Sequence, residues 1–496
     1  MILLGYDIGS SFIKVALVNS LTKQTIGVEK YPEKEMEIIA QYPDWAEQNP
    51  EYWWECVVAS TKKLLNKTHV NPNEIAGIGI SYQMHGLVLL DKDQQILRPS
   101  IIWCDSRAVE IGNQAFTELG KEKCLSHLLN SPGNFTASKL KWVQDNEPEL
   151  YGKIDKFMLP GDFIAMKLTG ESTTTISGLS EGIFWDFLRE EPAGFLFDHF
   201  GISVDLIPDI RESLGHHGKL TKTAAEKLGI PKETPVTYRA GDQLNNALSL
   251  NVLQPGDIAA TGGTSGVVYG VSNQVIFDQY SRVNSFAHVN HQSEQKRIGV
   301  LLCINGAGIQ HSWMQSISGK KYSYPQMEYQ ASKTSIGSDG VIILPFGNGV
   351  ERMLNNQNIG ASINSINFNR HQINHLIRGG LEGVAFSFIY GIEIMKEMGM
   401  SISRLRVGND NLFQSDIFSH TISALANCEV EIIDTTGAVG AAKAAGVTVG
   451  AFKSLDEAMS GGEVIKTVAE TKHLDQYNEA YQRWKNYLLK KLNNNS

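Results

Sequence analysis

The sequence lacks the features of a disulfide-stabilised, membrane-spanning or secreted protein. Its 5 cysteines are scattered, form no CxxC pair and are odd in number, so we expect reduced structural thiols instead of a disulfide framework. No apolar run approaches the ~20 residues that a membrane helix needs. The segment before Asp7 has no basic region typical of a signal peptide. We therefore expect a cytoplasmic protein.

The sequence also lacks positive charge. With a net charge of −9, the chain has no excess of Lys and Arg to cover a nucleic acid or an anionic membrane, and we expect neither as a partner. The negative net charge is still compatible with a small anionic ligand, because backbone amides and a metal ion can supply positive potential within one pocket. The 496 residues are too many for a single hydrophobic core, and a 42% hydrophobic share is typical of a globular protein. We expect at least two domains, with a cleft between them.

Several familiar motifs are missing. Every Gly-Lys pair lacks a following Ser or Thr, which excludes a P-loop, and neither GxGxxG nor HExxH occurs. His288 and His291 are spaced like two metal ligands, but no further ligand is clustered with them, so a structural role is favoured over zinc.

What is present is a repeated unit of strand, glycine-hydroxyl turn and strand. It occurs at residues 2–18 and again at residues 257–271, and further short buried strands are predicted at 76–81, 101–103 and 236–240. Helices are predicted at 51–63 and 371–398. This pattern indicates an α/β protein with two similar domains, which we assign to residues 1–248 and 249–496.

The first turn has the residues of a metal-linked phosphate site. Gly9 lets an anion approach the backbone, Ser10 and Ser11 offer hydroxyl and N–H donors, and Asp7 can hold Mg²⁺ through water. An ordinary hairpin turn would look the same in isolation. The second turn, with Gly263, Thr264 and Ser265, favours the functional interpretation, because two facing turns could hold a polyphosphate from both sides.

Two further residues are ambiguous from the sequence alone. Asp242 follows the strand predicted at 236–240, so it is either a structural turn residue or a catalytic carboxylate facing a cleft. His85, as a lone histidine, is equally compatible with a structural position in the core.

Ordered segments along residues 6–451 resolve part of this ambiguity. Taken together, they resemble the FGGY family of carbohydrate kinases, which belongs to the actin-like ATPase superfamily. The segments that carry the resemblance are residues 6–11, 83–86, 103–107, 134–142, 161–163, 168–171, 241–243 and 261–266.

The resemblance implies two actin-like (ribonuclease H-like) ATPase domains flanking a cleft for nucleotide and sugar, with ATP and Mg²⁺ as cofactors. Met84-His85 stands where glycerol kinases carry Arg-Glu, and it is similar to the members that phosphorylate D-xylulose to its 5-phosphate. A ketopentose and ATP are then the substrates, and Asp242 is the general base that activates the sugar O5. Two chains pairing as a homodimer would be compatible with this reading.

The resemblance also implies the binding residues. The sugar would be bound by Met84, His85, Trp103, Asn134 and Asp242. The metal would be held by Asp7 through water. The nucleotide and its phosphates would be bound by Gly9, Ser10, Ser11, Lys14, Gly263, Thr264, Ser265, Gly408, Asn409 and Gly437.

Some alternatives stay open. Residues 407–411 contain one glycine where the family commonly has three, which leaves the details of adenine binding undecided. Asp105 and Arg107 either contact the sugar or form an ion pair behind it. The substrate could be another small sugar or polyol, such as ribulose, fuculose or glycerol. A non-catalytic sugar- or nucleotide-binding regulator could use the same fold.

Overall fold

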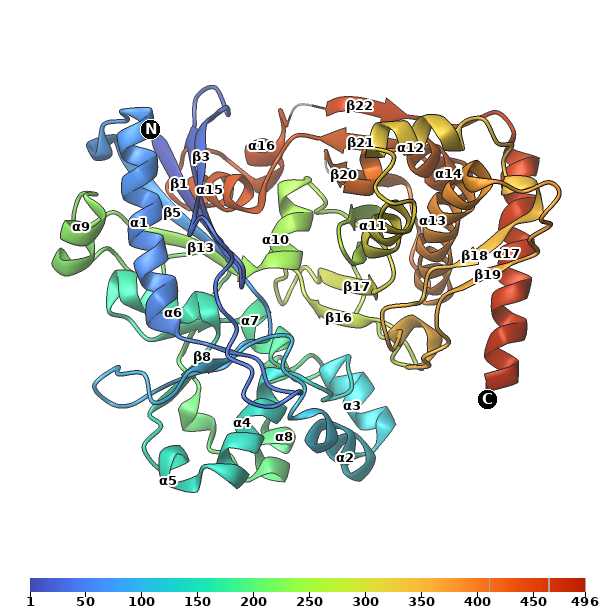
Figure 1. Cartoon of the computed structure of the whole chain (residues 1–496). Coiled ribbons are helices and arrows are strands. Elements are labelled where there is room, and N and C mark those ends of the chain that lie inside the picture. Colours follow the sequence, from blue (N-terminus) through green and yellow to red (C-terminus); the bar gives the residue numbers. More distant parts are fainter. Residues whose placement is uncertain (410, 463, 496) are drawn as a thin grey trace.

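Two β-sheets organise the chain into two lobes (Figure 1). The computed structural model describes residues 1–409, 411–462 and 464–495. The first lobe contains a five-stranded sheet in the order β13-β5-β1-β2-β3. Its strands are β1 (Ile2–Ile8), β2 (Ile13–Asn19), β3 (Thr25–Tyr31), β5 (Ile75–Tyr82) and β13 (Val236–Gly241).

Strand direction in the first sheet determines what meets at its edge. β1, β2 and β3 form antiparallel hairpins, whereas β5 runs parallel to both β1 and β13. Ile8 and Gly241, the last residues of β1 and β13, are both in register with Tyr82 at the end of β5. The segments that follow these three strands therefore leave the sheet at the same edge.

The second lobe repeats this arrangement. Its seven-stranded sheet has the order β16-β17-β15-β14-β20-β21-β22. As in the first sheet, an antiparallel hairpin (β14–β15) is joined by a parallel strand (β20). The predicted α/β class and the repeated strand–turn–strand unit are confirmed. The strands are β14 (Asp257–Gly262), β15 (Gly266–Ser272), β16 (Asn284–Ala287), β17 (Ile298–Ile304), β20 (Arg404–Gly408), β21 (Val430–Ile433) and β22 (Val464–Val468).

Helices cover both faces of the first sheet. α1 (Pro50–Thr68) packs on the face that carries Gly27. α15 (Gly437–Thr448), although it comes from late in the chain, packs on the opposite face. A Cβ added to Gly5 or Gly79 would lie only 2.0 Å from a carbonyl oxygen of α15. Glycine at these two positions therefore lets the helix backbone rest directly on the sheet.

The other helices of the first lobe lie mainly below its sheet in Figure 1. They are α2 (Val109–Leu119), α3 (Lys121–Leu128), α4 (Thr136–Asn146), α5 (Pro148–Tyr151), α6 (Pro160–Thr169), α7 (Ile176–Glu181) and α8 (Gly194–Phe200), with α9 (Lys222–Leu228) beside α1. One predicted strand here was too long. Only Ser100–Ile101 form a strand (β7), and Trp103 lies in the turn that follows.

The core of the second lobe is built around α13 (Ile373–Glu397), which packs against α14 (Asp416–Ala426) and α17 (Leu474–Asn495). Trp484 of α17 is buried, and its indole N–H donates to the carbonyl oxygen of Ile343 at 2.9 Å. The C-terminal helix therefore belongs to the second lobe. The remaining helices of this half are α11 (Gly308–Ile317), α12 (Tyr324–Ala331) and α16 (Leu455–Met459).

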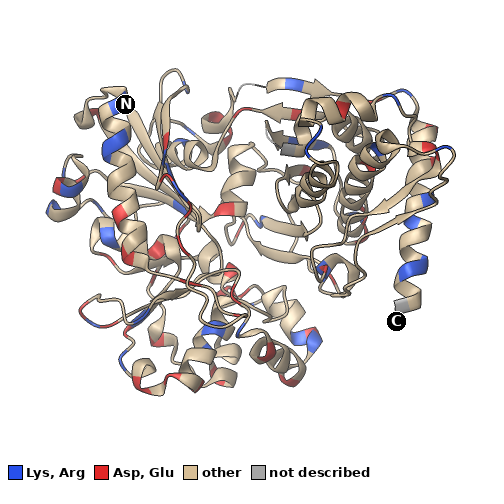
Figure 2. Ribbon diagram, viewed as in Figure 1, with Lys and Arg blue, Asp and Glu red and all other residues tan. Residues whose placement is uncertain are grey.

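The surface agrees with the charge balance of the sequence. Lys and Arg are scattered over both lobes in the view of Figure 2, interspersed with Asp and Glu. Within the described residues, no helix is both long and apolar enough to cross a membrane.

Candidate active site

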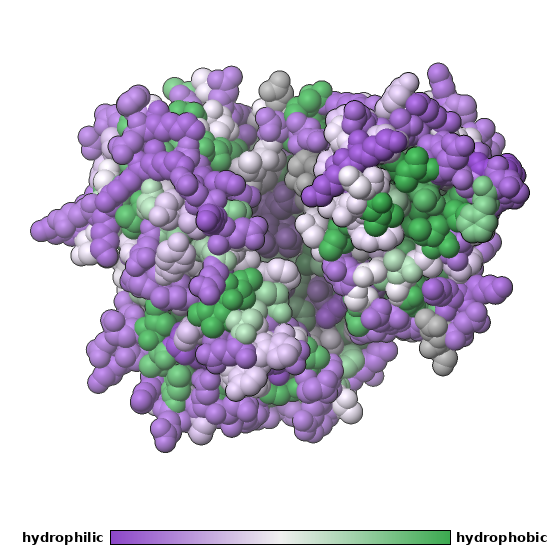
Figure 3. Space-filling view, in the orientation of Figure 1, coloured by the Kyte–Doolittle hydropathy of each residue, from purple (hydrophilic) through white to green (hydrophobic). Residues whose placement is uncertain are grey.

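A deep groove separates the two lobes on the face shown in Figure 3. The aligned ends of β1, β5 and β13 place three sequence-predicted segments at one sheet edge, those of Asp7, His85 and Asp242. α10 (Asp242–Ser249) starts at this edge and leads towards the second lobe (Figure 1).

Asp242 is the first residue of α10 and is half-buried. Burial, and after it the nearby charge of Asp7, raises the pKa of its carboxyl group, whereas hydrogen bonding to Gln243 and the charge of Lys14 lower it, and the resulting pKa is about 7. A carboxylate with a pKa near neutrality is matched to proton transfer, because it is ionised at working pH and still basic enough to accept a proton. A carboxyl group with this pKa at the edge of the sheet is suited to proton transfer.

Asp7 lies between the first turn and the start of α15. Its Oδ1 accepts a hydrogen bond from Ser81 Oγ at 3.1 Å, and Lys14 Nζ lies 3.8 Å from its Oδ2. A Cβ on Gly437 would come within 3.1 Å of the Asp7 carboxyl carbon. Asn245 of α10 donates to the Gly437 carbonyl at 2.9 Å. Asp7, Lys14 and Gly437, which are far apart in sequence, are therefore neighbours.

The first turn is held by hydrogen bonds from its surroundings. Gly9 N–H donates to Phe12 O at 3.1 Å, and Met36 N–H donates to Ser11 O at 2.9 Å. The Ser10 carbonyl accepts from Gln48 at 2.7 Å, while the Ser10 hydroxyl accepts from the indole of Trp103 at 3.2 Å. The predicted phosphate turn and one predicted sugar-binding residue are thus in direct contact.

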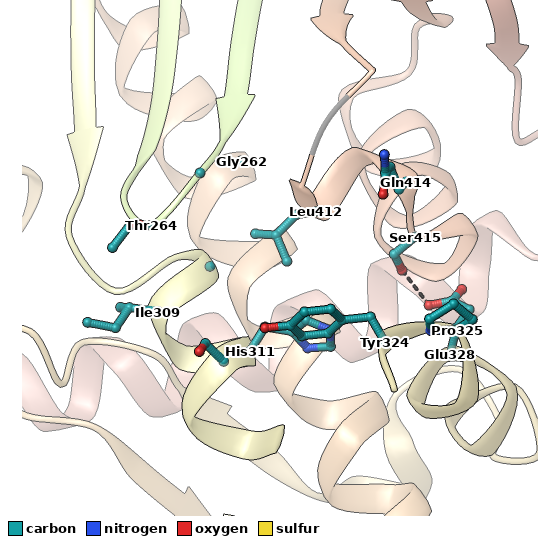
Figure 4. A pocket seen from close by; sticks show the side chains of 13 residues that line it. Gly262, Thr264, Ile309, His311, Tyr324, Pro325, Glu328, Leu412, Gln414 and Ser415 are labelled. Atoms are coloured by element: carbon teal, nitrogen blue, oxygen red, sulfur yellow. Dashed lines mark hydrogen bonds between the residues drawn. The ribbon is translucent and has the colours of Figure 1, made fainter. Parts of the chain in front are cut away.

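The second turn lies against the start of α11. Gly263 O accepts from Gly308 N–H at 2.9 Å, and Thr264 O accepts from Ile309 N–H at 3.0 Å. Beside it opens a cavity of about 680 Å³, a size suited to a nucleotide (Figure 4). The cavity is lined by Gly262, Gly263, Thr264, Gly308, Ile309, His311, Ser312, Tyr324, Pro325, Glu328, Leu412, Gln414 and Ser415.

One wall of this cavity is aromatic. The rings of His311 and Tyr324 are stacked, with centroids 5.0 Å apart and planes inclined by 25° (Figure 4). Burial lowers the pKa of His311 to about 4, so this ring is neutral at physiological pH. A neutral stacked pair offers a flat apolar surface to a planar base.

The residues that directly follow the segment with the atypical glycine pattern line the cavity, namely Leu412, Gln414 and Ser415. Within the segment, Gly408 ends β20 and Asn409 N–H donates to Ile433 O at 3.1 Å, and neither residue lines the cavity. Asp410 lies outside the described residues. Of the residues that line the cavity, the sequence analysis named Gly263 and Thr264 of the second turn but neither His311 nor Tyr324.

His85 lies three residues beyond the end of β5, at the same sheet edge as Asp242. Its Nδ1 is 2.9 Å from the carbonyl oxygen of Glu181, so Nδ1–H donates there and Nε2 remains an acceptor. Burial, together with the positive charge of Lys139, lowers the pKa of His85 to about 3, and the ring is neutral. Its ring packs against Phe135 of the first lobe, with ring centroids 4.9 Å apart, and against Phe286 of the second lobe, with ring centroids 5.6 Å apart.

Met84 and Asn134 are close to this group. A Cβ on Gly241 would lie 2.6 Å from Met84 Cγ, which places Met84 directly behind the residue that precedes Asp242. Asn134 donates from its amide to the Asp105 carbonyl, and its buried Oδ1 has no hydrogen-bond partner among the described residues. An unpartnered buried acceptor of this kind is suited to a ligand hydroxyl.

Lys139 is a functional candidate that the sequence analysis did not single out. It is fully buried, and its ammonium group donates to His85 O at 2.9 Å and to Ile102 O at 3.0 Å. Burial lowers its pKa to about 8. Through these two bonds it links the segment that contains His85 to the segment before Trp103. In the sequence, Lys139 is one lysine in a helical segment of mixed polarity, and this gives little indication that its side chain is buried.

The Asp105–Arg107 alternative is decided by the structure in favour of an ion pair. Arg107 Nη2 lies 2.6 Å from Asp105 Oδ2, and both side chains are almost inaccessible to solvent. The guanidinium also stacks over the Trp45 ring, with Arg107 Cζ 3.6 Å from the ring centroid. Asp105 therefore stabilises the loop that carries Trp103, and Trp103 itself is 53% exposed.

The structure offers no zinc-like cluster in its described part, where no three His, Cys, Asp or Glu side chains could jointly hold a metal. His288 is buried and hydrogen-bonded to Tyr269 Oη at 2.8 Å. Its predicted structural role agrees with these contacts.

The fold and this site define a class of protein. Residues 2–249 match the N-terminal domain of the FGGY family of carbohydrate kinases, and residues 258–449 match its C-terminal domain. The chain belongs to the FGGY family and is a sugar kinase that uses ATP.

Within that family, the chain is similar to xylulose kinases. It is 29% identical to the xylulose kinase of Bacillus subtilis, with 97% of this chain and 96% of that protein covered. It is 27% identical to the xylulose kinase of Escherichia coli, over 92% of this chain and 91% of that one. The crystal structure of xylulose kinase from Rhodospirillum rubrum has the same fold, with a TM-score of 0.90, 22% identity and 99% of both chains covered.

Proposed function

We propose that this kinase transfers the γ-phosphoryl group of ATP to O5 of D-xylulose, with Asp242 as the general base. The observation that carries the proposal is the position of Asp242. Its carboxyl group has a pKa of about 7, is close enough to Asp7 to feel its charge, and lies at the same sheet edge as the segment of the neutral His85. A nucleotide-sized cavity opens in the second lobe. The substrate is suggested by the curated relatives, which are xylulose kinases over nearly the whole chain.

In this mechanism Asp242 accepts the proton of the O5 hydroxyl while that oxygen attacks the γ-phosphorus in line. The new bond joins O5 to phosphorus, the bond from the γ-phosphorus to the bridging oxygen breaks, and ADP leaves. Assistance of this kind contributes ~10²–10⁴-fold. The chain otherwise positions the reactants and excludes water from the groove between the lobes.

The residues at the sheet edge are suited to Mg²⁺ bound with a nucleotide. Mg²⁺ prefers oxygen ligands, retains several waters and is commonly bound by one or two carboxylates together with phosphates. Asp7 can hold it through water, because its carboxylate is partly exposed beside Lys14. The chemistry that Mg²⁺ supplies when bound is neutralisation of phosphate charge.

The phosphates would bind the two glycine-hydroxyl turns, with Gly9, Ser10 and Ser11 on one side and Gly263, Thr264 and Ser265 on the other. Lys14 and the N-terminus of α15 at Gly437 add positive potential. The adenosine would occupy the cavity bounded by His311 and Tyr324, near Gly408 and Asn409.

The sugar would lie against His85, Met84 and Trp103. His85 Nε2 accepts a hydrogen bond from a sugar hydroxyl, since its Nδ1–H is engaged by Glu181 O. The free Oδ1 of Asn134 can accept a second one. The exposed ring of Trp103 offers an apolar wall to the C–H side of the sugar.

The test is ADP release with ATP and a panel of D-xylulose, D-ribulose, fuculose and glycerol. We expect D-xylulose to give the highest kcat/KM, and Asp242→Ala to lower kcat by ~10²–10⁴-fold. Asp198→Asn, at an exposed position of α8, is the matched control and should behave as wild type. No stimulation by D-xylulose would refute the substrate, and near-normal turnover by Asp242→Ala would refute the base.

A further inference from the structure

The outer edge of the second sheet is attached to the first lobe. β16 is the edge strand there, and its free backbone groups bond across the groove. Asn130 of the first lobe donates to Ser285 O at 2.7 Å and accepts from Ser285 N–H at 3.0 Å. Ser180 Oγ accepts from Ala287 N–H at 3.0 Å. The position of β16 relative to the sugar side of the site is therefore well defined.

One face of β16 points towards His85. Residues two apart in a strand share a face, so Asn284 and Phe286 lie on the same side of the sheet. The ring of Phe286 contacts that of His85 at 5.6 Å. Cys303 of the neighbouring strand, two residues beyond the partner of Asn284, lies on this same face and is exposed.

Arg352 lies over this face. Its Nη1 donates to Asn284 Oδ1 at 2.5 Å, and the side chain is half-buried. Among the described residues, no carboxylate lies within ion-pair distance of it, in contrast to Arg107 or Arg239, which are ion-paired. The charge of Arg352 also contributes, after burial and Lys139, to the low pKa of His85, and it opposes the rise that burial causes in the pKa of Cys303, as expected of a guanidinium close to both.

The backbone beside Arg352 is fixed. The preceding residue, Glu351, is fully buried, and its carboxylate accepts from Asn305 N–H at 3.0 Å and from Gly306 N–H at 3.1 Å. The backbone that carries the Arg352 guanidinium is therefore held in place by the hydrogen bonds of Glu351. A group that discriminates between substrates needs such a fixed position.

The hydrogen-bonding groups of Arg352 and His85 indicate which kind of ligand could bind between them. A guanidinium can only donate, whereas the neutral His85 presents an acceptor at Nε2. Phosphorylation at O5 of a 2-ketopentose requires O5 to be free. Ring closure of such a sugar consumes O5 by adding it to C2, so the reactive form is the open chain with a free keto oxygen. A keto oxygen can only accept, and it is complementary to the guanidinium.

We propose that Arg352 recognises the keto oxygen of an open-chain ketose bound against His85, and so determines preference for ketoses over polyols. This inference rests on the proposed function. It assigns to the second lobe a specificity residue for a sugar that is otherwise bound by the first lobe.

The test compares D-xylulose with xylitol and D-arabinitol, the two pentitols formed by reducing its carbonyl group. Arg352→Met should lower kcat/KM for D-xylulose by roughly 10–100-fold, the loss expected for a hydrogen bond to a charged group. The rates with both pentitols and the KM for ATP should stay unchanged. Arg352→Lys should fall in between, and Arg370→Met, at an exposed position of the same lobe, should match wild type.

A second variant keeps the test informative if Arg352→Met does not fold. Asn284→Ala retains the guanidinium but removes its orienting partner, so the preference for ketose should fall in the same direction by a smaller factor. D-xylulose binding without nucleotide, measured by titration calorimetry, should weaken in parallel.

Three outcomes would overturn the proposal. The first is an equal loss with ketose and pentitols in Arg352→Met, which indicates a structural role, and the second is no loss at all. The third is a wild-type preference for a five-carbon aldonate, which means that Arg352 binds a carboxylate. Absence of any D-xylulose-dependent ADP release by wild type would instead refute the proposed function, so the two failures are distinguishable.

Discussion

At the level of single residues, the pKa of Asp242 is set by opposing effects. Removal from water and the neighbouring Asp7 both disfavour the ionised form, while Gln243 and Lys14 favour it, and the pKa ends at about 7. His85, only a short distance away, is neutral, because burial lowers its pKa to about 3. Asp242 is therefore the group of this pair whose protonation changes near neutral pH.

This difference predicts the pH dependence of the reaction. The base must be ionised, so kcat/KM for the sugar should fall about tenfold per pH unit below pH ~7 and reach a plateau above it. The measurement is the initial rate of ADP release from pH 5 to pH 9. His85→Asn should lower the rate but keep the same midpoint, and a midpoint that moves with His85 would contradict the assignment.

Stability gives an independent check on the same pKa. The folded pKa of about 7 is above that of an unfolded Asp, so between pH 4 and 7 the folded state binds more protons, and stability falls as pH rises through that window. Asp242→Asn removes the unfavourable free energy of ionising a buried carboxyl group. Its melting temperature should exceed that of wild type at pH 8, and the difference should vanish near pH 4.

Sequence patterns identified the residues that belong to local motifs. Asp7 and Asp242 could be recognised because each lies at the end of a short buried strand, Asp7 within β1 and Asp242 directly after β13. The ion pair of Asp105 with Arg107 was one of two open interpretations, and it needed the structure to decide. Lys139 and Arg352 escaped notice, since a single basic residue without a neighbouring motif does not reveal whether its partner is water, a carboxylate or a distant carbonyl.

At the level of elements, the cavity proposed for the nucleotide is formed where α11, α12 and the segment before α14 meet the second turn. Tyr324 is the first residue of α12, and its ring stacks on His311 of α11. No sequence motif joins these two helices. The cavity exists because the antiparallel hairpin β14–β15 places its turn against the start of α11.

This arrangement predicts a selective effect on ATP. Tyr324→Ala removes one ring of the stacked wall and should raise the KM for ATP by roughly 5–30-fold, equivalent to about 1–2 kcal/mol of lost base contact. The KM for the sugar should change little, because the sugar side is built from other elements. Tyr329→Ala is the matched control, since Tyr329 is on the same helix but 64% exposed and away from the cavity lining. Equal effects of the two variants would refute the cavity assignment.

At the level of the whole molecule, the two lobes are joined by hydrogen bonds as well as by the covalent chain. Asn130 is almost completely buried and bonds both the N–H and the carbonyl of Ser285. These bonds hold β16, and with it Phe286, against the ring of His85. The surroundings of His85, where we propose that the sugar binds, are therefore completed by contacts between lobes.

Breaking this junction should affect one substrate more than the other. Asn130→Ala leaves the N–H and the carbonyl of Ser285 without a hydrogen-bond partner. An unpaired buried group costs about 1–3 kcal/mol of stability, and water that enters the gap reduces this cost. We expect the KM for D-xylulose to rise roughly tenfold and the KM for ATP to stay near wild type. Steady-state kinetics with each substrate varied would measure both. Asn146→Ala, at an exposed position of α4, is the control, and a rise in the KM for ATP alone would contradict the prediction.

The sequence by itself determined the class of this protein: the repeated strand–turn–strand units, the phosphate turns and the position of Asp242 after a strand are all local features. Their physical basis is hydrophobic patterning and turn chemistry over a few residues. Tertiary structure alone decided which distant groups meet, because contacts such as those of Phe286 with His85 and of α15 with Gly5 and Gly79 join segments hundreds of residues apart. For that reason the kinase class followed from the sequence, whereas the place of Arg352 beside Asn284, on the face of β16 that meets His85, required the folded chain.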